Sequence, residues 1–221
     1  MAKKIYLSAA AHEHDNPTKC TGTCSENTHC KKYMDIVENR LKALGIDVKR
    51  GFTNQTGDAA MKNRVAEANA WKADLYYVAH TNAGGGRYSS TLCWSDDASK
   101  KKAAVIGKYR KWTHGHKVSV RTDLYEIRMT NMTSLYDELI FHDNAEDCAW
   151  FHNGGMEQVA EETVQALCEL VGVSYKAPIS NTANVQELEN KVKTLQSEVE
   201  GLKKTIATLN SKITAAKNAL S

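Results

Sequence analysis

No stretch of this 221-residue sequence approaches the ~20 consecutive apolar residues that a helix needs to cross a bilayer. The beginning of the chain, residues 1–8, carries two lysines but only enough apolar side chains for one short strand. A secretory signal peptide needs a longer apolar segment than this. We therefore expect no membrane insertion and no signal peptide.

An excess of one charge is also missing from most of the chain. Of 29 basic and 26 acidic residues, seven Lys and four Glu lie from residue 176 onward, which leaves 22 of each sign in residues 1–175. The formal charge of +3 therefore belongs to the C-terminal tail, and the neutral body does not predict a nucleic-acid partner. With 42% hydrophobic and 25% charged residues, the composition is that of a folded globular protein and excludes general disorder.

The C-terminal tail has an unbroken heptad pattern, with apolar residues at alternating spacings of three and four. The a positions are Val185, Val192, Val199, Ile206, Ile213 and Leu220, and the d positions are Leu188, Leu195, Leu202 and Leu209. β-branched residues at a with Leu at d favour a parallel two-stranded coiled coil, so the tail predicts self-association as a dimer. No polar residue at a specifies the number of helices, and a trimer or tetramer stays open.

A short segment rich in turn-forming residues separates this tail from the rest of the chain. It includes Pro178, which is flanked by Ser, Asn and Thr residues. We therefore predict a globular domain over residues 1–172, a linker over 173–184 and a coiled-coil segment over 185–221. The alternative is that the tail forms a single amphipathic helix folded back on the domain.

The body alternates segments of strand and helix periodicity. We expect strands near residues 4–8, 46–49, 73–79, 124–127 and 135–140, and helices over residues 26–44, 58–71, 98–113 and 156–171. Strands separated by such helices predict an α/β fold: a twisted, mostly parallel or mixed sheet covered by helices on both faces. In these sheets, functional groups gather beyond the carboxyl ends of the strands.

Several side chains that can bind metal occupy such positions. His12 and His14 follow the first expected strand, and His80 ends the third. Glu138 lies within a late strand, and Glu26 opens the first long helix. Two imidazoles and one carboxylate can form a zinc site whose fourth position is open to water, and a further carboxylate can take the proton of that water. Because the chain has eight histidines, several other combinations of zinc ligands stay open.

Four short motifs follow one another along the body. They are Ile5–Ser8 followed by His12, the amphipathic helix that begins at Glu26, Ala79–Ala83 around His80, and Glu138–Asn144. In this order they resemble the motifs of the zinc-dependent N-acetylmuramoyl-L-alanine amidases of the amidase_3 family, especially its phage endolysin branch. The resemblance covers about residues 3–172.

The resemblance implies a reaction and a set of roles. The reaction is hydrolysis of the amide that joins N-acetylmuramic acid to L-alanine in bacterial peptidoglycan. On this resemblance His12, Glu26 and His80 bind one Zn²⁺ per chain, and Glu138 is the general base that then protonates the leaving amine. Zinc lowers the pKa of its bound water from 15.7 toward ~7 and polarises the scissile carbonyl.

One departure from the family affects the first ligand. The wider family opens with Asp-Pro-Gly-His-Gly-Gly, whereas this chain has Ser-Ala-Ala-Ala-His-Glu-His over residues 8–14. The Pro-Gly turn is missing, and the spacing to the histidine grows by one. We favour His12, and His14 is the alternative first ligand, because a His-x-His pair in an extended chain points both rings to the same side.

Three further residues are candidate substrate contacts. Asn82 lies in the third motif, and His142 lies in the fourth, where it could contact the substrate or the oxyanion. Arg87 could bind a carboxylate of the stem peptide. An ordinary exposed arginine and a structural histidine are the competing interpretations.

The six cysteines give no single prediction. Cys20, Cys24 and Cys30 lie close together in the sequence, and the other three are scattered. Without a signal peptide we expect free thiols in a reducing cytoplasm. A Cys20–Cys24 disulfide formed after release, or a second metal site of these two cysteines with His29, stays open.

The resulting hypothesis is a phage or prophage endolysin that waits in the host bacterial cytoplasm and acts on the cell wall after release. A bacterial autolysin with the same chemistry is one alternative. A non-catalytic wall-binding or structural protein on a coiled-coil stalk is the other. In each case the expected partners are peptidoglycan and other copies of this chain.

Overall fold

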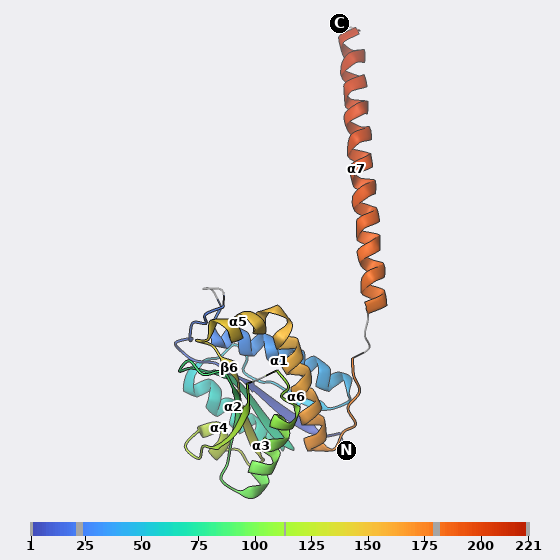
Figure 1. Cartoon of the computed structure of the whole chain (residues 1–221). Helices are drawn as coiled ribbons and strands as arrows, with labels where there is room; N and C mark the ends of the chain where they lie inside the picture. Colours follow the sequence, from blue (N-terminus) through green and yellow to red (C-terminus); the bar gives the residue numbers. More distant parts are fainter. Residues whose placement is uncertain (1, 21–23, 113, 179–181, 220–221) are drawn as a thin grey trace. The chain divides into compact units, whose positions relative to one another are not determined.

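The computed structural model describes four stretches of the chain, residues 2–20, 24–112, 114–178 and 182–219. Within residues 182–189 only the backbone is described. The chain divides into two compact units, Met1–Lys176 and Ala177–Ser221. The first unit is an α/β domain and the second contains one long helix (Figure 1).

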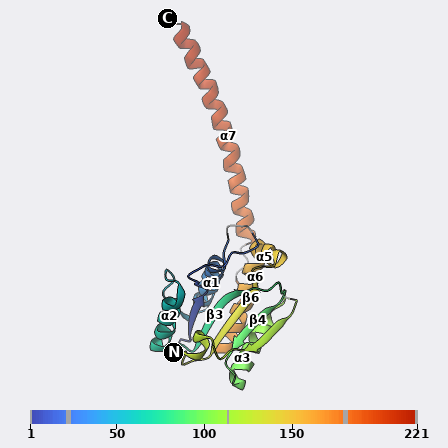
Figure 2. The ribbon, with the colours of Figure 1, turned by 90° about the vertical axis from the view of Figure 1, so that its left-hand side faces the viewer.

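Six strands of the first unit form one sheet. They are β1 (Lys4–Ala9), β2 (Asp47–Lys49), β3 (Leu75–Asn82), β4 (Ser89–Cys93), β5 (His116–Val120) and β6 (Ser134–Phe141). Their order across the sheet is β2-β1-β3-β6-β4-β5 (Figure 2). All neighbouring pairs are parallel except β4 and β6, which are antiparallel. The predicted mixed α/β sheet is confirmed.

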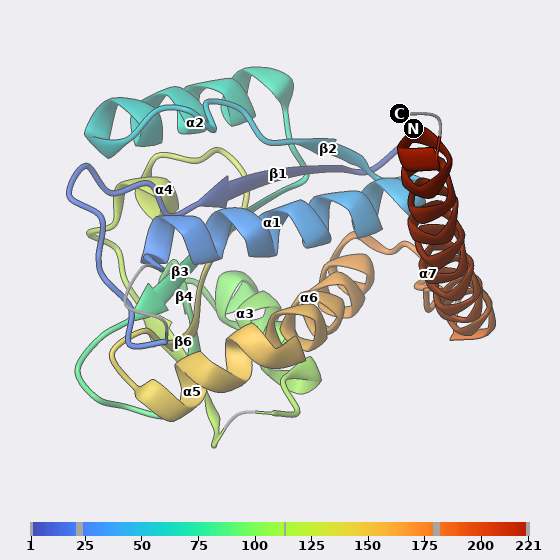
Figure 3. The same ribbon diagram turned by 90° about the horizontal axis from the view of Figure 1, so that it is seen from above.

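Helices cover both faces of this sheet, as the alternating pattern predicts. In the first unit they are α1 (Glu26–Ala43), α2 (Gly57–Trp71), α3 (Asp97–Tyr109), α4 (Tyr125–Arg128), α5 (Ala145–Trp150), the π-helical turn η1 (Phe151–Gly155) and α6 (Met156–Val171). The second unit contains α7 (Thr182–Ala219). Figure 3 shows α2 on one side of β1 and α1 on the other. On the side of α1, helices α3 and α6 complete the layer.

The strands contribute side chains to two hydrophobic clusters because successive residues of a strand face opposite sides. Ile5, Leu7 and Tyr77 are buried in the cluster that includes residues of α1, α3 and α6. Tyr6 and Val78 are buried in the smaller cluster with residues of α2. Burying one large apolar side chain contributes roughly 1.5–3 kcal/mol. The two clusters together hold the sheet in place between its helices.

A buried ion pair crosses the larger core. The guanidinium of Arg110, just after α3, contacts the carboxylate of Asp137 in β6, and both side chains are fully buried. The hydroxyl of Tyr77 donates a hydrogen bond to Asp137 Oδ2 over 2.6 Å. Arg110 Nη2 also donates to Thr163 Oγ1 over 2.8 Å. The charge of Asp137 is therefore compensated by side chains rather than by water.

Some elements differ from the sequence-based expectation. Residues 124–127, predicted as a strand, lead into and form most of the short helix α4, since a run this short fits either structure. Strands β4 and β5 were not predicted, because their sequences are largely polar. The helix expected over residues 98–113 ends at Tyr109, and residue 113 lies outside the described residues.

The second unit presents an apolar seam along α7. The described seam residues are Val192, Leu195, Val199, Leu202, Ile206, Leu209 and Ile213, and each is at least 49% exposed. They are the predicted a and d positions. The side chains of Val185 and Leu188, and the whole of Leu220, lie outside the described residues. A single copy of the chain therefore leaves this seam uncovered. The linker over residues 173–184 and the coiled coil itself remain predictions.

None of the described helices combines the length and the apolar character that crossing a membrane requires. The longest of them, α7, is one continuous helix that carries charged residues along its whole length.

Candidate active site

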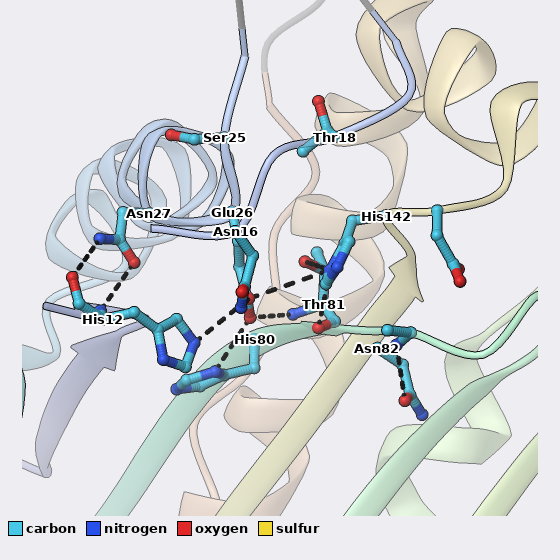
Figure 4. Close-up of polar contacts among 12 residues, drawn as sticks. His12, Asn16, Thr18, Ser25, Glu26, Asn27, His80, Thr81, Asn82 and His142 are labelled. Carbon is cyan, nitrogen blue, oxygen red and sulfur yellow. Dashed lines mark hydrogen bonds and ion pairs between the residues drawn. The ribbon is translucent and has the colours of Figure 1, made fainter. Parts of the chain in front are cut away.

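Three predicted metal ligands converge at the carboxyl end of the sheet: His12, Glu26 and His80 (Figure 4). Their ligand atoms all lie within 4.8 Å of one another. His12 Nε2 is 3.2 Å from Glu26 Oε2, and His80 Nδ1 is 3.0 Å from Glu26 Oε1. They come from three different elements: the loop after β1, the first turn of α1, and β3. The structure thus gathers two imidazoles and one carboxylate at one point.

Glu26 is the centre of this group. It is almost completely buried, and its two oxygens also accept hydrogen bonds from Thr81 N (2.9 Å) and Asn16 Nδ2 (2.6 Å). Burial by itself raises the pKa of Glu26, but the contacts with His12 and His80 hold that pKa well below its usual range. Its place in the first turn of a helix also favours the negative charge. Glu26 is therefore an ionised carboxylate.

The backbone of His12 is held by a residue that the sequence reasoning missed. The backbone N–H of His12 donates to Asn27 Oδ1, and Asn27 Nδ2 donates to the His12 carbonyl, both over 2.9 Å. These two bonds fix the backbone of His12 beside the first turn of α1. The hydrogen bond to Glu26 raises the pKa of His12. The only sequence signal for Asn27 is its place directly after Glu26.

His14, the alternative first ligand, lies elsewhere. It is exposed and does not belong to the group formed by His12, Glu26 and His80. Residues 13 and 14 form a bend, so the extended His-x-His geometry on which the alternative depended is not present. His14 instead lies at the wall of the adjoining cavity.

His80 lies inside β3 rather than at its end, because the strand continues to Asn82. Its ring stacks on Tyr136 of β6 at a centroid distance of 4.5 Å and meets the ring of His12 edge-on at 5.0 Å. The pairing with β6 shifts between His80 and Asn82, which marks a β-bulge. Tyr136 was not predicted, and its place two residues before Glu138 on the same strand face is the signal that could have identified it.

Glu138, the predicted general base, is the register partner of His80 across β3 and β6. Side chains of directly opposed residues lie on the same face of a sheet, so the carboxyl group of Glu138 flanks the His80 ring. Its Oε2 is buried and has no hydrogen-bond partner among the described residues. Burial raises the pKa of Glu138 to about 7, although His80 acts in the opposite direction. Such a carboxyl group can both take up and release a proton near neutral pH.

His142 approaches the group from the end of β6. It is buried, and its Nδ1 lies 3.0 Å from Thr81 Oγ1 and 3.9 Å from Glu26 Oε2. Its backbone N–H donates to the Asn82 carbonyl over 2.8 Å. Of the three predicted substrate contacts, His142 is therefore the one that the structure brings to the side of Glu26.

The other two predicted substrate contacts are engaged within the protein. Asn82 Oδ1 accepts a hydrogen bond from the backbone of the next residue. Arg87 forms ion pairs with Glu146 (2.6 Å) and Asp147 (3.0 Å) at the start of α5. Two carboxylates already compensate its charge, which weakens the expectation that Arg87 binds a carboxylate of the stem peptide.

A cavity of about 650 Å³ opens beside the three ligands. Its walls include His12, His80, Met61, Arg64, Tyr125 and Tyr136. This volume is in the range of sites that accept small organic ligands. The cavity therefore gives a substrate access to His12 and His80 from the side of α2 and α4.

The cysteines do not form the pairs considered from the sequence. Cys20 forms a disulfide with Cys148, 128 residues further along, and Cys24 is a free thiol. The expectation of free thiols is wrong at Cys20 and Cys148, and the alternative of a Cys20–Cys24 disulfide is wrong as well. Sequence spacing could not predict this pair, since only the fold brings α5 to the loop before α1.

Known proteins resemble this chain in sequence and in fold. An endolysin of Bacillus phage SPP1 is 27% identical over 126 residues, which are 52% of this chain and 46% of that protein. The chain thus spans less than half the length of this curated relative.

Solved structures share the fold of this chain. One is the catalytic domain of CwlV, an N-acetylmuramoyl-L-alanine amidase from Bacillus (Paenibacillus) polymyxa var. colistinus. It superposes with a TM-score of 0.69 at 22% identity, and the match covers 78% of this chain and 99% of that domain. The catalytic domain of an endolysin targeting Clostridia difficile gives 0.62 at 20% identity, with coverages of 76% and 97%. At these identities the two structures establish the fold.

A family model matches most of the chain. Residues 7–169 correspond to the amidase_3 model, which is described as N-acetylmuramoyl-L-alanine amidase. The matched range contains His12, Glu26, His80 and Glu138. The resemblance seen in the sequence motifs is confirmed, and the chain belongs to the amidase_3 family.

Proposed function

We propose that this chain is a zinc-dependent peptidoglycan amidase of the phage endolysin type. It hydrolyses the amide bond between N-acetylmuramic acid and the L-alanine of the stem peptide. The observation that carries this proposal is the convergence of His12, Glu26 and His80 beside Glu138, in a member of the amidase_3 family. As an endolysin it waits in the host cytoplasm and reaches the wall after release.

The donor set fits a catalytic zinc ion. His12, Glu26 and His80 would hold it, because two imidazoles and one ionised carboxylate within 4.8 Å of one another match the three protein ligands of such sites. When bound, zinc supplies a water molecule of lowered pKa and polarises the carbonyl of the substrate. Thr81 and Asn16 fix the orientation of the Glu26 carboxylate by hydrogen bonds, which is the usual second layer of a metal site.

Glu138 moves the proton in this reaction. Its Oε2, which has no partner among the described residues, accepts a proton from the attacking water as the oxygen–carbon bond forms. When the carbon–nitrogen bond breaks, the same carboxyl group returns that proton to the amine of L-alanine. To His142, whose Nδ1 lies 3.9 Å from Glu26 Oε2, we assign the role of donating a hydrogen bond to a substrate oxygen.

The reaction is tested by mass spectrometry of purified peptidoglycan after digestion. Free N-terminal L-alanine on released stem peptides supports the amidase. New reducing sugar ends would identify a glycosidase instead. Binding to the wall without any new chain end would support the non-catalytic alternative.

The choice of the first ligand gives a paired prediction. His12→Ala is expected to lower the zinc content by one ion per chain and to abolish hydrolysis, because a site with two protein ligands holds zinc weakly. His14→Ala is expected to keep both the zinc content and the hydrolysis, because this side chain is exposed and is not one of the three converging ligands. Elemental analysis and release of stem peptides measure the two properties. A His12→Ala protein with full zinc content and activity would overturn the assignment.

The tail is proposed to assemble the enzyme. Each apolar residue of the described seam is about half exposed or more in a single chain, and a parallel coiled coil would cover the seam. Two or more catalytic domains on one coil raise the effective concentration of the enzyme on an insoluble polymer. A dimer is favoured, and a trimer or tetramer is compatible with the seam.

Truncation after Lys176 is expected to give a monomer with unchanged turnover of soluble muropeptides and slower lysis of whole cells. Sedimentation measures the mass, with the full chain as reference. A matched pair of full-length variants, Leu195→Lys with Leu202→Lys against Ser197→Lys with Thr205→Lys, separates loss of the seam from added charge. An oligomeric truncated protein would rule out the tail as the assembling element.

A further inference from the structure

A second group of metal-binding atoms lies apart from the three ligands of the active site. Cys20 Sγ is 3.8 Å from His29 Nε2, and His29 Nε2 is 2.7 Å from His152 Nε2. The ligand atoms of these three residues all lie within 4.8 Å of one another. One sulfur and two nitrogen atoms therefore converge, and the sulfur of Cys148 is bonded to that of Cys20.

The sequence spacing and the fold support the same grouping. Cys148 in α5 and His152 in η1 are four residues apart, so a continuous helical run places them on one face. His29 lies in α1 and is completely buried. Its Nδ1 has no hydrogen-bond partner among the described residues, so its polar contacts are made through Nε2. That nitrogen faces the sulfur of Cys20 and the ring of His152.

We propose that Cys20, His29, Cys148 and His152 form a Cys₂His₂ zinc site when the two cysteines are reduced. Two thiolates and two imidazoles are a donor set of closed, structural zinc sites. Bonds of about 2.3 Å to sulfur and about 2.0 Å to nitrogen need donor atoms that lie roughly 3–4 Å apart. Reduction frees the sulfur of Cys148, which is bonded to Cys20 in the disulfide, to become the fourth donor beside the other three. The site has no open position and is not a second catalytic centre.

The disulfide and the zinc site exclude each other because they use the same two sulfur atoms. A dithiol or phosphine reductant adds two electrons, and two protons from solvent complete the conversion of the disulfide into two thiols. Binding of Zn²⁺ then forms two zinc–sulfur bonds and releases the two thiol protons. In a reducing compartment the zinc form is expected, and under oxidising conditions the disulfide is expected.

Both forms connect the segments that build the active site. His29 is three residues after Glu26 on α1. The loop that ends in Cys20 contains Asn16, which orients Glu26, and its Lys19 N–H donates to the carbonyl of His142 over 2.9 Å. The proposed zinc site therefore fastens this loop and α1 to α5, and none of its four residues lines the cavity beside His12 and His80.

Cobalt binding tests the proposal independently of the amidase activity. The full-length chain is freed of metal, kept reduced with a phosphine, and titrated with Co²⁺ without oxygen. We expect two equivalents to bind, one of them with the near-ultraviolet thiolate-to-cobalt charge-transfer band of a tetrahedral sulfur site. The same chain with its disulfide intact is expected to bind one equivalent without this band, because the ligands His12, Glu26 and His80 include no sulfur.

Variants identify the ligands. Cys148→Ser and His152→Ala are expected to bind one equivalent fewer under reducing conditions, and Cys148→Ser to reduce the charge-transfer band strongly. Cys24→Ser, which changes a free thiol in the same segment, is the matched control and should keep the full band. Equal cobalt binding by the reduced and oxidised chains, or an unchanged band in Cys148→Ser, would overturn the proposal. A chain without amidase activity that keeps the thiolate-to-cobalt band would support this zinc site and count only against the proposed catalytic function.

Discussion

Glu138→Gln is expected to lower kcat for the amide hydrolysis by about 10²–10⁴-fold while zinc remains bound. The substitution keeps the size of the side chain but removes the group that takes up and returns the proton, and general acid–base catalysis contributes a factor of this order. The carboxyl group is not needed to hold the metal, because His12, Glu26 and His80 form the ligand group without it. The measurement is the initial rate of release of free N-terminal L-alanine, together with elemental analysis.

A carboxylate elsewhere in the domain is the control for this result. Glu157 is exposed on α6, and Glu157→Gln should keep both the rate and the zinc content. A Glu138→Gln protein that carries zinc and cleaves at the rate of the unmodified chain would show that another group transfers the proton. Loss of zinc together with activity would assign Glu138 to the ligands instead.

Arg110→Met is expected to reduce the free energy of unfolding by about 3–5 kcal/mol. The substitution leaves the carboxylate of Asp137 buried without its cationic partner, and an unpaired buried charge costs this much. Tyr77 and Thr91 still donate hydrogen bonds to Asp137, but neither brings a positive charge. Urea unfolding followed by circular dichroism measures the change.

Two further variants separate the charge effect from a general loss of packing. Arg110→Met combined with Asp137→Leu removes both charges and should recover a large part of the stability. Arg121→Met breaks an exposed ion pair with Asp123 and should leave the unfolding midpoint nearly unchanged. A midpoint for Arg110→Met equal to that of the unmodified chain would contradict the expected effect.

The parts of the fold that the sequence predicted are those with strong periodicity. The strands β1, β3 and β6 are rich in apolar and aromatic residues, and α6 and α7 have long regular apolar spacings. The polar strand β4 was missed although all five of its residues are buried, because its neighbours in the sheet, rather than its own side chains, determine its conformation. β5 is likewise largely polar, and it lies at the edge of the sheet, where its side chains are half-buried or exposed.

The residues of the candidate site that could be predicted are those whose side chains commonly bind metal or transfer protons. His12, Glu26, His80 and Glu138 could be selected by residue type, strand-end position and the order of the motifs. Asn27 could not, because an asparagine at the start of a helix is ordinary and its contact with the backbone of His12 exists only in the folded chain. The partnership of Cys20 with Cys148 is hidden for the same reason.

Asp137 and Glu138 are consecutive residues of β6, and consecutive side chains of a strand point to opposite faces of the sheet. Asp137 therefore contacts the buried Arg110, and Glu138 lies on the same face as His80. If β6 slipped by one residue against β3, the two carboxylates would exchange faces. Arg110 would then lose its counter-charge, and the shorter side chain of aspartate would replace glutamate beside the metal ligands. The stability of the core and the chemistry of the proposed site therefore require the same alignment of β6. A chain with β6 misaligned would lose stability as well as the glutamate beside His80.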